Sequence, residues 1–150
     1  QWPQIGRLAV ALGPGGFTGT RLTVVMARTL AQQLAVPLDG VGSFVLMARR
    51  LQLQEPTWLV QTLPRRGVVA GCYAPDPAAW SGMAELAPPK LYPDLAALPA
   101  GSQRPAVVEL PADVEQLLAL TCLAACDPAS HPGPWQPVLP LYPTSPVAEG

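Results

Sequence analysis

Residues 8–21 read LAVALGPGGFTGTR, and this stretch decides the fold. The apolar run at residues 8–12 predicts a buried strand, and the apolar-periodic segment at residues 18–34 predicts a helix. Four glycines and one proline at residues 13–19 predict a tight turn from strand to helix. Such a turn points backbone N–H groups outward at the positive end of the helix. It either binds an anion or simply packs the helix close against a sheet, and the sequence leaves both readings open.

The glycine segment does not match either common phosphate-binding motif. It lacks the Gly-Lys-Ser/Thr of a P-loop, and Gly13, Gly15 and Gly19 leave one residue too many for Gly-x-Gly-x-x-Gly. We therefore expect no firmly bound cofactor, and a small ATPase or phosphotransferase remains the alternative. The residues that would form an anion or nucleotide loop are Gly13, Gly15, Gly16, Phe17, Thr18 and Gly19.

The helix predicted at residues 18–34 is apolar around much of its circumference. At about 100° per residue, its apolar side chains fill an arc of roughly 200°, about twice what a helix needs to cover one sheet. These side chains are Leu22, Val24, Met26, Ala27, Leu30, Ala31 and Leu34. The helix is therefore predicted to be buried on more than one side, either within its own domain or against another protein.

The remaining face of this helix is mostly polar, with Val25 among its residues. Arg21 and Arg28 lie two turns apart on one side, where they are either solvated or paired with carboxylates of a partner. The residues that we assign to a partner interface are Arg21, Leu22, Val25, Met26, Arg28, Thr29 and Gln32.

The first fifty residues alternate between strand and helix. A short extended piece at residues 38–41 follows the first helix, and Ser43 is a suitable N-cap for a second helix reaching Leu51. This order of elements predicts a parallel sheet with a right-handed crossover.

Beyond Glu55-Pro56, residues 57–62 and 68–73 predict an antiparallel hairpin, with Gly67 easing the return. Short helices and loops are expected over residues 74–101, a strand over 105–110 and a helix over 111–126. The prolines after Asp127 predict an extended tail that lies along a surface. The chain accordingly divides into a first-lobe remnant (1–53), a second lobe (54–130) and the Pro-rich tail (131–150).

Composition excludes several functions. A net charge of −1 over 150 residues, with no basic cluster, argues against direct binding of nucleic acid. Three irregularly spaced cysteines argue against a disulfide framework and favour a reducing, cytoplasmic location. No stretch predicts a membrane span. His131 is the sole histidine, so neither a catalytic triad nor a metal site is expected, and we predict no enzyme activity for this chain alone.

The glycine segment resembles the signature of the TsaB family. Residues 12–22, the small and apolar pattern at 25–31, and the turn at 40–44 carry the resemblance. Residues 65–67 resemble the start of the family's second lobe, and residues 137–143 its C-terminal Pro-x-Tyr element. The resemblance implies an α/β fold of the actin-like, sugar-kinase-like and Hsp70-like ATPase superfold, with two lobes of mixed sheet flanked by helices.

The resemblance also implies a function. Members of the family are non-catalytic partners of the catalytic subunit TsaD, and they contact it through helices of the first lobe. With TsaE and ATP, the assembled complex transfers a threonylcarbamoyl group to the adenosine beside the tRNA anticodon. The chain has Gly16 where the family usually has Ser, and Leu63 or Pro64 where it often has Asp. No initiator Met opens the chain, and the family's first strands and first helix have no counterpart. We therefore expect an incomplete first lobe, with an open sheet edge beside residues 8–12 and the possibility of a homodimer.

Overall fold

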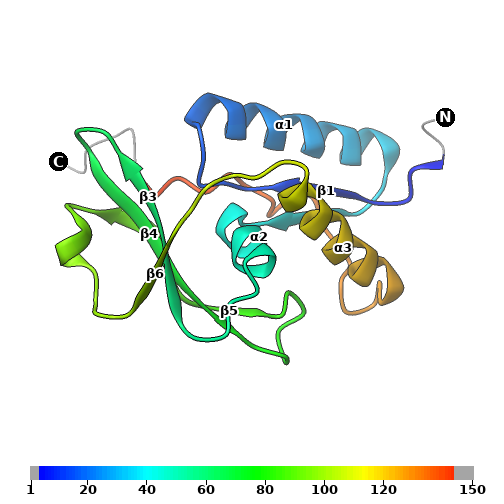
Figure 1. Ribbon diagram of the computed structural model, residues 1–150. Coiled ribbons are helices and arrows are strands. Elements are labelled where there is room, and N and C mark those ends of the chain that lie inside the picture. Colours follow the sequence, from blue (N-terminus) through cyan, green and yellow to red (C-terminus); the bar gives the residue numbers. More distant parts are fainter. Residues whose placement is uncertain (1–3, 144–150) are drawn as a thin grey trace.

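The computed structural model describes residues 4–143 as two sheets joined by a central helix (Figure 1). Residues 1–3 and 144–150, which include Trp2 and the end of the predicted tail, lie outside the described part. The elements are β1 (Leu8–Ala11), α1 (Phe17–Leu34), β2 (Leu38–Val41), α2 (Ser43–Arg50), β3 (Thr57–Leu63), β4 (Gly67–Pro75), β5 (Met83–Tyr92), η2 (Leu95–Ala97), β6 (Ser102–Pro105) and α3 (Ala112–Cys126).

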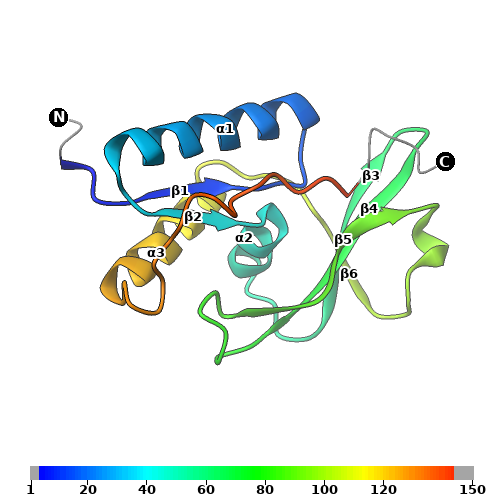
Figure 2. The same cartoon turned by 180° about the vertical axis from the view of Figure 1, so that it is seen from behind.

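The first sheet has two parallel strands, β1 and β2, with Leu8 opposite Leu38 and Ala11 opposite Val41. Helix α1 lies along one face of this sheet, while α2 and α3 lie on the other side (Figures 1 and 2). The predicted order of strand, helix, strand and helix is confirmed here. The parallel pairing follows because a helix connects the two strands.

The second sheet has the strand order β5-β4-β3-β6. β3 and β4 form the predicted antiparallel hairpin, while β6 pairs with β3 in parallel, so the sheet is mixed. Gly67 has a φ of +109°, and a Cβ there would lie 2.2 Å from the carbonyl oxygen of Tyr92. Only glycine fits this position, which confirms that Gly67 shapes the return of the hairpin.

Residues 74–101 contain a long strand rather than the predicted short helices and loops. β5 runs for ten residues at the edge of the sheet and includes Pro88 and Pro89. Both prolines fall where the pairing skips from Ala87 to Lys90 beside an irregularity of register. Proline is tolerated at edges and bulges because the missing N–H leaves no ladder bond unmade there.

Two boundary predictions are also wrong. The strand expected at residues 105–110 lies at 102–105, and only Ala106 beyond it continues the ladder, by donating to the carbonyl of Val60 at 2.8 Å. Ser43 does not cap α2, because Gly42 occupies that place and makes no side-chain cap. Instead the Ser43 hydroxyl accepts a hydrogen bond from the backbone N–H of Gly13 at 3.1 Å.

Helix α2 is the centre of the core. Phe44, Met47 and Ala48 pack with Leu59 and Val69 of the four-stranded sheet. On its other side, Leu46 packs with Val41 of β2 and Leu120 of α3. One short helix thereby supplies apolar side chains to the cores of both sheets.

The proline-rich segment after α3 is more deeply embedded than predicted. It follows the outer edge of β2, where Gly133 accepts a hydrogen bond from the N–H of Leu38 at 2.8 Å. Val138 is only 7% exposed and belongs to the core between α1 and the two-stranded sheet. The prediction of a purely superficial tail was wrong because an apolar side chain between prolines can still be inserted into a core.

Candidate partner-binding surface and glycine loop

Helix α1 carries large apolar side chains that nothing in the described chain covers. Leu22, Val25 and Met26 are 67%, 51% and 58% exposed. Val24 and Ala31 of the same helix are fully buried against β1 and β2. The sequence predicted one continuous apolar arc, and the structure divides it into a sheet-facing stripe and a solvent-facing stripe.

The other predicted interface residues surround this exposed stripe. Arg21, Thr29 and Gln32 are exposed beside it. Arg28 is half-buried, and its guanidinium lies 5.4 Å from the centre of the Trp135 ring, a favourable cation–π geometry. Arg28 is thus held by the chain's own C-terminal segment at the margin of the surface. Sequence reasoning missed this contact because the two residues are far apart in the chain.

The glycine loop is built around Gly13 and Ser43. Gly13 has a φ of +89°, donates to the Ser43 hydroxyl and accepts from the Ser43 N–H at 2.8 Å. A Cβ at Gly13 would lie 3.1 Å from Cγ2 of Thr20, and one at Gly15 would lie 3.0 Å from its Oγ1. The two glycines therefore let the loop pack closely on the first turn of α1. This close packing is one of the two roles that the sequence left open.

The outer part of the loop remains open. Gly16 is the N-cap residue of α1 without a side-chain cap, Phe17 and Thr18 begin the helix, and a Cβ at Gly16 or Gly19 would meet nothing within 4 Å. A hollow of about 270 Å³ separates Gly15 and Gly16 from the β3–β4 hairpin. Its polar side chains include Gln61 and the exposed Arg66. Arg66 gives this hollow a positive side chain, and among the described residues that line it no polar side chain is buried.

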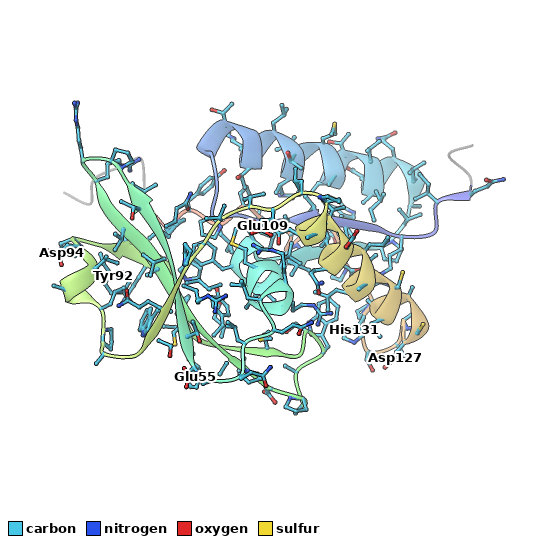
Figure 3. All side chains as sticks on the ribbon, viewed as in Figure 1. Glu55, Tyr92, Asp94, Glu109, Asp127 and His131 are labelled. Carbon is cyan, nitrogen blue, oxygen red and sulfur yellow. The ribbon has the colours of Figure 1, made fainter. Side chains whose placement is uncertain are left out.

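A second network joins α2 to α3 and to the loop that precedes α3. Arg50 contacts Asp113 at 2.6 Å and Glu109 at 3.1 Å and donates to the carbonyl of Val107. Figure 3 labels Glu109, which lies shortly before α3. Asp113 is only 6% exposed, and its second oxygen accepts from the N–H of Glu109. Both oxygens of Asp113 therefore have partners within the fold, while the largely exposed Glu109 contributes one oxygen to Arg50.

The titratable groups with shifted pKa values do not converge on the glycine loop. Burial, together with the Glu85 carboxylate, raises the pKa of Tyr73, whose hydroxyl donates to Glu85 at 2.9 Å. Burial raises the pKa of the Cys72 thiol, and hydrogen bonds from Ser130 lower the pKa of Asp127. These groups stand in separate parts of the fold. Within residues 4–143, no group of three His, Cys, Asp or Glu side chains could hold a metal ion.

Other surfaces offer less. A hollow of about 610 Å³ lies at the opposite end of β3, lined by residues 51–55, Thr57 and residues 102–104. Two of its polar side chains are bonded to each other, since the Ser102 hydroxyl donates to Glu55. No helix in the described part is long and apolar enough to cross a bilayer.

Comparison with known proteins gives a consistent result. Residues 1–67 match the family model described as TsaD, tRNA N6-adenosine threonylcarbamoyltransferase. A segment of 44 residues is 41% identical to the tRNA threonylcarbamoyladenosine biosynthesis protein TsaB of Bacillus subtilis (strain 168). That match covers 29% of this chain and 19% of the relative, so it spans about a fifth of the curated protein's length.

Two solved structures share the fold. One is YeaZ from Pseudomonas aeruginosa, with a TM-score of 0.68 and 20% identity over 95% of this chain and 76% of that chain. The other is described as an uncharacterized protein with similarity to peptidase YEAZ from Pseudomonas aeruginosa, with a TM-score of 0.69, 20% identity and coverage of 95% and 75%. The prediction of the actin-like ATPase fold is confirmed. The chain is thus similar to TsaB over a local segment, and it shares its fold with YeaZ over 95% of its length.

Proposed function

We propose that this chain is a non-catalytic scaffold subunit that binds TsaD during threonylcarbamoyl transfer to tRNA. The names of its relatives support a role in threonylcarbamoyladenosine biosynthesis. The single observation that carries the proposal is the exposed apolar stripe of Leu22, Val25 and Met26 on α1.

The stripe has the character of a protein interface. Its residues recur at the three- and four-residue spacing that places side chains on one helix face, a face that is normally polar when solvent covers it. Apolar patches rimmed by polar residues are typical of protein contacts. Here Arg21, Thr29 and Gln32 provide that rim.

In the proposed mechanism, α1 packs against an equivalent helix of TsaD and stabilises the active arrangement of that partner. TsaD performs the chemistry, while TsaE and ATP act in the assembled complex. This chain alone holds no nucleotide firmly and contacts neither membrane nor nucleic acid directly. The complex works in the cytoplasm, where the tRNA is.

The test is co-purification with TsaD after Met26→Asp or Val25→Asp. An unpaired charge in a buried contact costs several kcal/mol, so binding should weaken at least about a hundredfold. The matched control is Met26→Leu, which keeps an apolar side chain and should bind normally. Unchanged recovery of TsaD with both charged variants would refute the proposal.

A folding control separates lost binding from lost structure. Ala27 is half-buried on the sheet-facing side of α1, so Ala27→Asp should unfold the chain, whereas Met26→Asp should not. Circular dichroism distinguishes the two outcomes. If Met26→Asp also unfolds the chain, Met26 contributes to stability rather than to an interface.

The alternative function is a small ATPase or phosphotransferase that uses the glycine loop. The hollow between Gly16 and Arg66 is the feature that favours it. The scaffold proposal expects flat calorimetric titrations of the isolated chain with ATP and ADP. Measurable affinity together with turnover would establish the alternative, and Arg66→Ala should then weaken binding.

A further inference from the structure

The core beneath α1 contains few side chains from the helix itself. Among the described residues, Val24, Ala27 and Ala31 are the members of this core that α1 supplies, and only Val24 and Ala31 are buried. Two of these three side chains are single methyl groups, which remove little apolar area from water. The contact between this 18-residue helix and its sheet therefore depends on apolar groups that come from elsewhere in the chain.

The segment after α3 supplies such groups. We call residues 131–143 the strap. Its Val138 is 7% exposed and belongs to the same core as Val24, and its Trp135 packs against that core. A Cβ at Gly40 of β2 would lie 3.0 Å from Cγ1 of Val138, so the Val138 side chain occupies the space that a side chain at Gly40 would need. The strap thereby fills the volume between the sheet and the small side chains of α1.

Backbone hydrogen bonds fix the strap at two points. The N–H of Leu38 in β2 donates to the carbonyl of Gly133 at 2.8 Å, and the N–H of Leu141 donates to the carbonyl of Leu12 at 2.8 Å. Between these points the strap runs alongside β2, under α1 in the view of Figure 2, where it is coloured orange to red. The amides of Leu38 and Leu141 therefore report directly whether the strap is docked.

The strap also touches α1 beside the exposed apolar stripe. The guanidinium of Arg28 lies 5.4 Å from the centre of the Trp135 ring. At about 100° per residue, Arg28 is about 60° around the helix from Val25 of the stripe. The strap thus supports α1 from one side as well, while its buried Val138 side chain lies between the helix and the sheet, away from the stripe.

We propose that the strap holds α1 in its binding position, so that the affinity for the partner depends on docking of the strap. This inference rests on the proposed function of α1. With the strap docked, α1 lies on the sheet and presents its apolar stripe; with the strap released, one valine and two alanines are left to hold the helix. TsaD then binds with an apparent dissociation constant equal to the intrinsic constant divided by the docked fraction.

Amide hydrogen exchange by NMR tests whether the strap and α1 open together. In the unmodified chain, we expect the amides of residues 24–31 to exchange together with those of Leu38 and Leu141, and faster than the amides of β3 and β4. Val138→Ala leaves a cavity beneath α1 and should speed up exchange of this whole group by one factor, at least about tenfold. The matched control is Leu139→Ala, which removes more atoms from the strap at a position that is 54% exposed, and α1 should then exchange at its usual rate.

Val138→Asp tests the coupling to the partner. An unpaired charge at this buried position should release the strap in most molecules, and the TsaD affinity should fall at least about tenfold although Val138 lies outside the stripe. Leu139→Asp introduces the same charge at the neighbouring exposed position and should bind TsaD normally. The NMR signals of β3 and β4 show whether the second sheet of Val138→Asp stays folded. In the reverse direction, TsaD at about 100 times its Kd should slow exchange of the Leu38 amide of the unmodified chain about a hundredfold.

Three results would overturn the inference. The first is exchange of the α1 amides at a rate unrelated to that of Leu38 and Leu141, or unchanged by Val138→Ala. The second is full TsaD affinity in Val138→Asp with its strap released, and the third is unchanged exchange at Leu38 when TsaD is bound. The second result together with lost binding in Met26→Asp would leave the proposed function intact, whereas normal binding by both variants would refute the proposed function as well. The reverse measurement needs no substitution, so it decides the coupling even if Val138→Asp does not fold.

Discussion

Replacing Asp39 with Asn should destabilise the fold severely. Asp39 accepts two hydrogen bonds from Arg7 at 2.7 Å and one from the Thr121 hydroxyl, and it is 8% exposed. Arg7 also donates to the carbonyl of His131, so this cluster ties together the approach to β1, β2, α3 and the C-terminal segment. The hydrogen bond to Asp39 raises the pKa of Arg7. This rise is lost with Asp39, but the guanidinium stays charged at neutral pH because the ordinary pKa of arginine is already far above it.

The size of the effect follows from burial. Both side chains are less than a tenth exposed, so the pair belongs with buried ion pairs rather than with weak surface pairs. Removing one charge from a buried pair costs about 3–5 kcal/mol. Because Arg7 keeps its bond to His131, we expect Asp39→Asn to cost about 3 kcal/mol, at the lower end of that range.

The assay is urea denaturation followed by circular dichroism. Thr121→Val is the matched comparison, because it removes one hydrogen bond and no charge, and it should cost about 1 kcal/mol. The double variant Arg7→Leu with Asp39→Leu leaves no unpaired charge and should recover most of the loss. A loss below about 1 kcal/mol for Asp39→Asn, or a double variant no more stable than that single variant, would refute the reasoning.

Three further predictions concern other parts of the fold. Gly67→Ala should cost more than about 2 kcal/mol by urea denaturation, because the new Cβ would lie 2.2 Å from the backbone oxygen of Tyr92 at a φ of +109°; a smaller loss would mean that the hairpin adjusts easily. The raised pKa of Tyr73 keeps its phenol neutral in the folded state, so stability should fall above about pH 10, as the phenol ionises in the unfolded chain, and Tyr73→Phe should lessen that fall; an identical pH profile for both proteins would contradict it. Arg28→Ala should lower the free energy of unfolding by about 0.5–1 kcal/mol in urea denaturation, whereas Arg28→Lys should lower it less because lysine retains part of the cation–π contact with Trp135. Equal losses from the two variants would argue against that contact.

The first part of the fold could be predicted because its signals are local. The glycines between an apolar run and an apolar-periodic segment predict β1, the turn and α1 directly, and all three are present. Turn chemistry likewise predicted the β3–β4 hairpin, where Gly67 has the positive φ that the return needs. Such features depend only on residues that are neighbours in the sequence, so one sequence contains all the information needed to predict them.

The errors arose where distant contacts override local preference. Pro88 and Pro89 indicated loops, yet β4 offers an edge on which a strand with an irregular register can pair. Serine is a common N-cap residue, but the Ser43 hydroxyl instead accepts a hydrogen bond from the N–H of Gly13, thirty residues away in the chain. Val138 lies among prolines and is nevertheless buried, because the core between α1 and β2 has room for it.

The candidate surface was only partly predictable for the same reason. Periodicity indicated that α1 has more apolar surface than one sheet can cover, but it could not assign each side chain to a face. Val25 was placed among polar residues, and the structure exposes it together with Leu22 and Met26. The contact of Arg28 with Trp135 depends on the path of the C-terminal segment, which no local pattern encodes.

The two arginines at the end of α2 have a mechanical consequence. Arg49 donates to Gln116 of α3 and to the carbonyl of Ser81 just before β5, while Arg50 binds Asp113 and Glu109. A hinge motion that moved one sheet away from the other would have to break either the bond of Arg49 to Ser81 or the bonds of both arginines to α3 and its preceding loop, and it would remove α2 from one of its two cores. The helix that connects the two sheets therefore also resists their separation, because it is packed into the core of each.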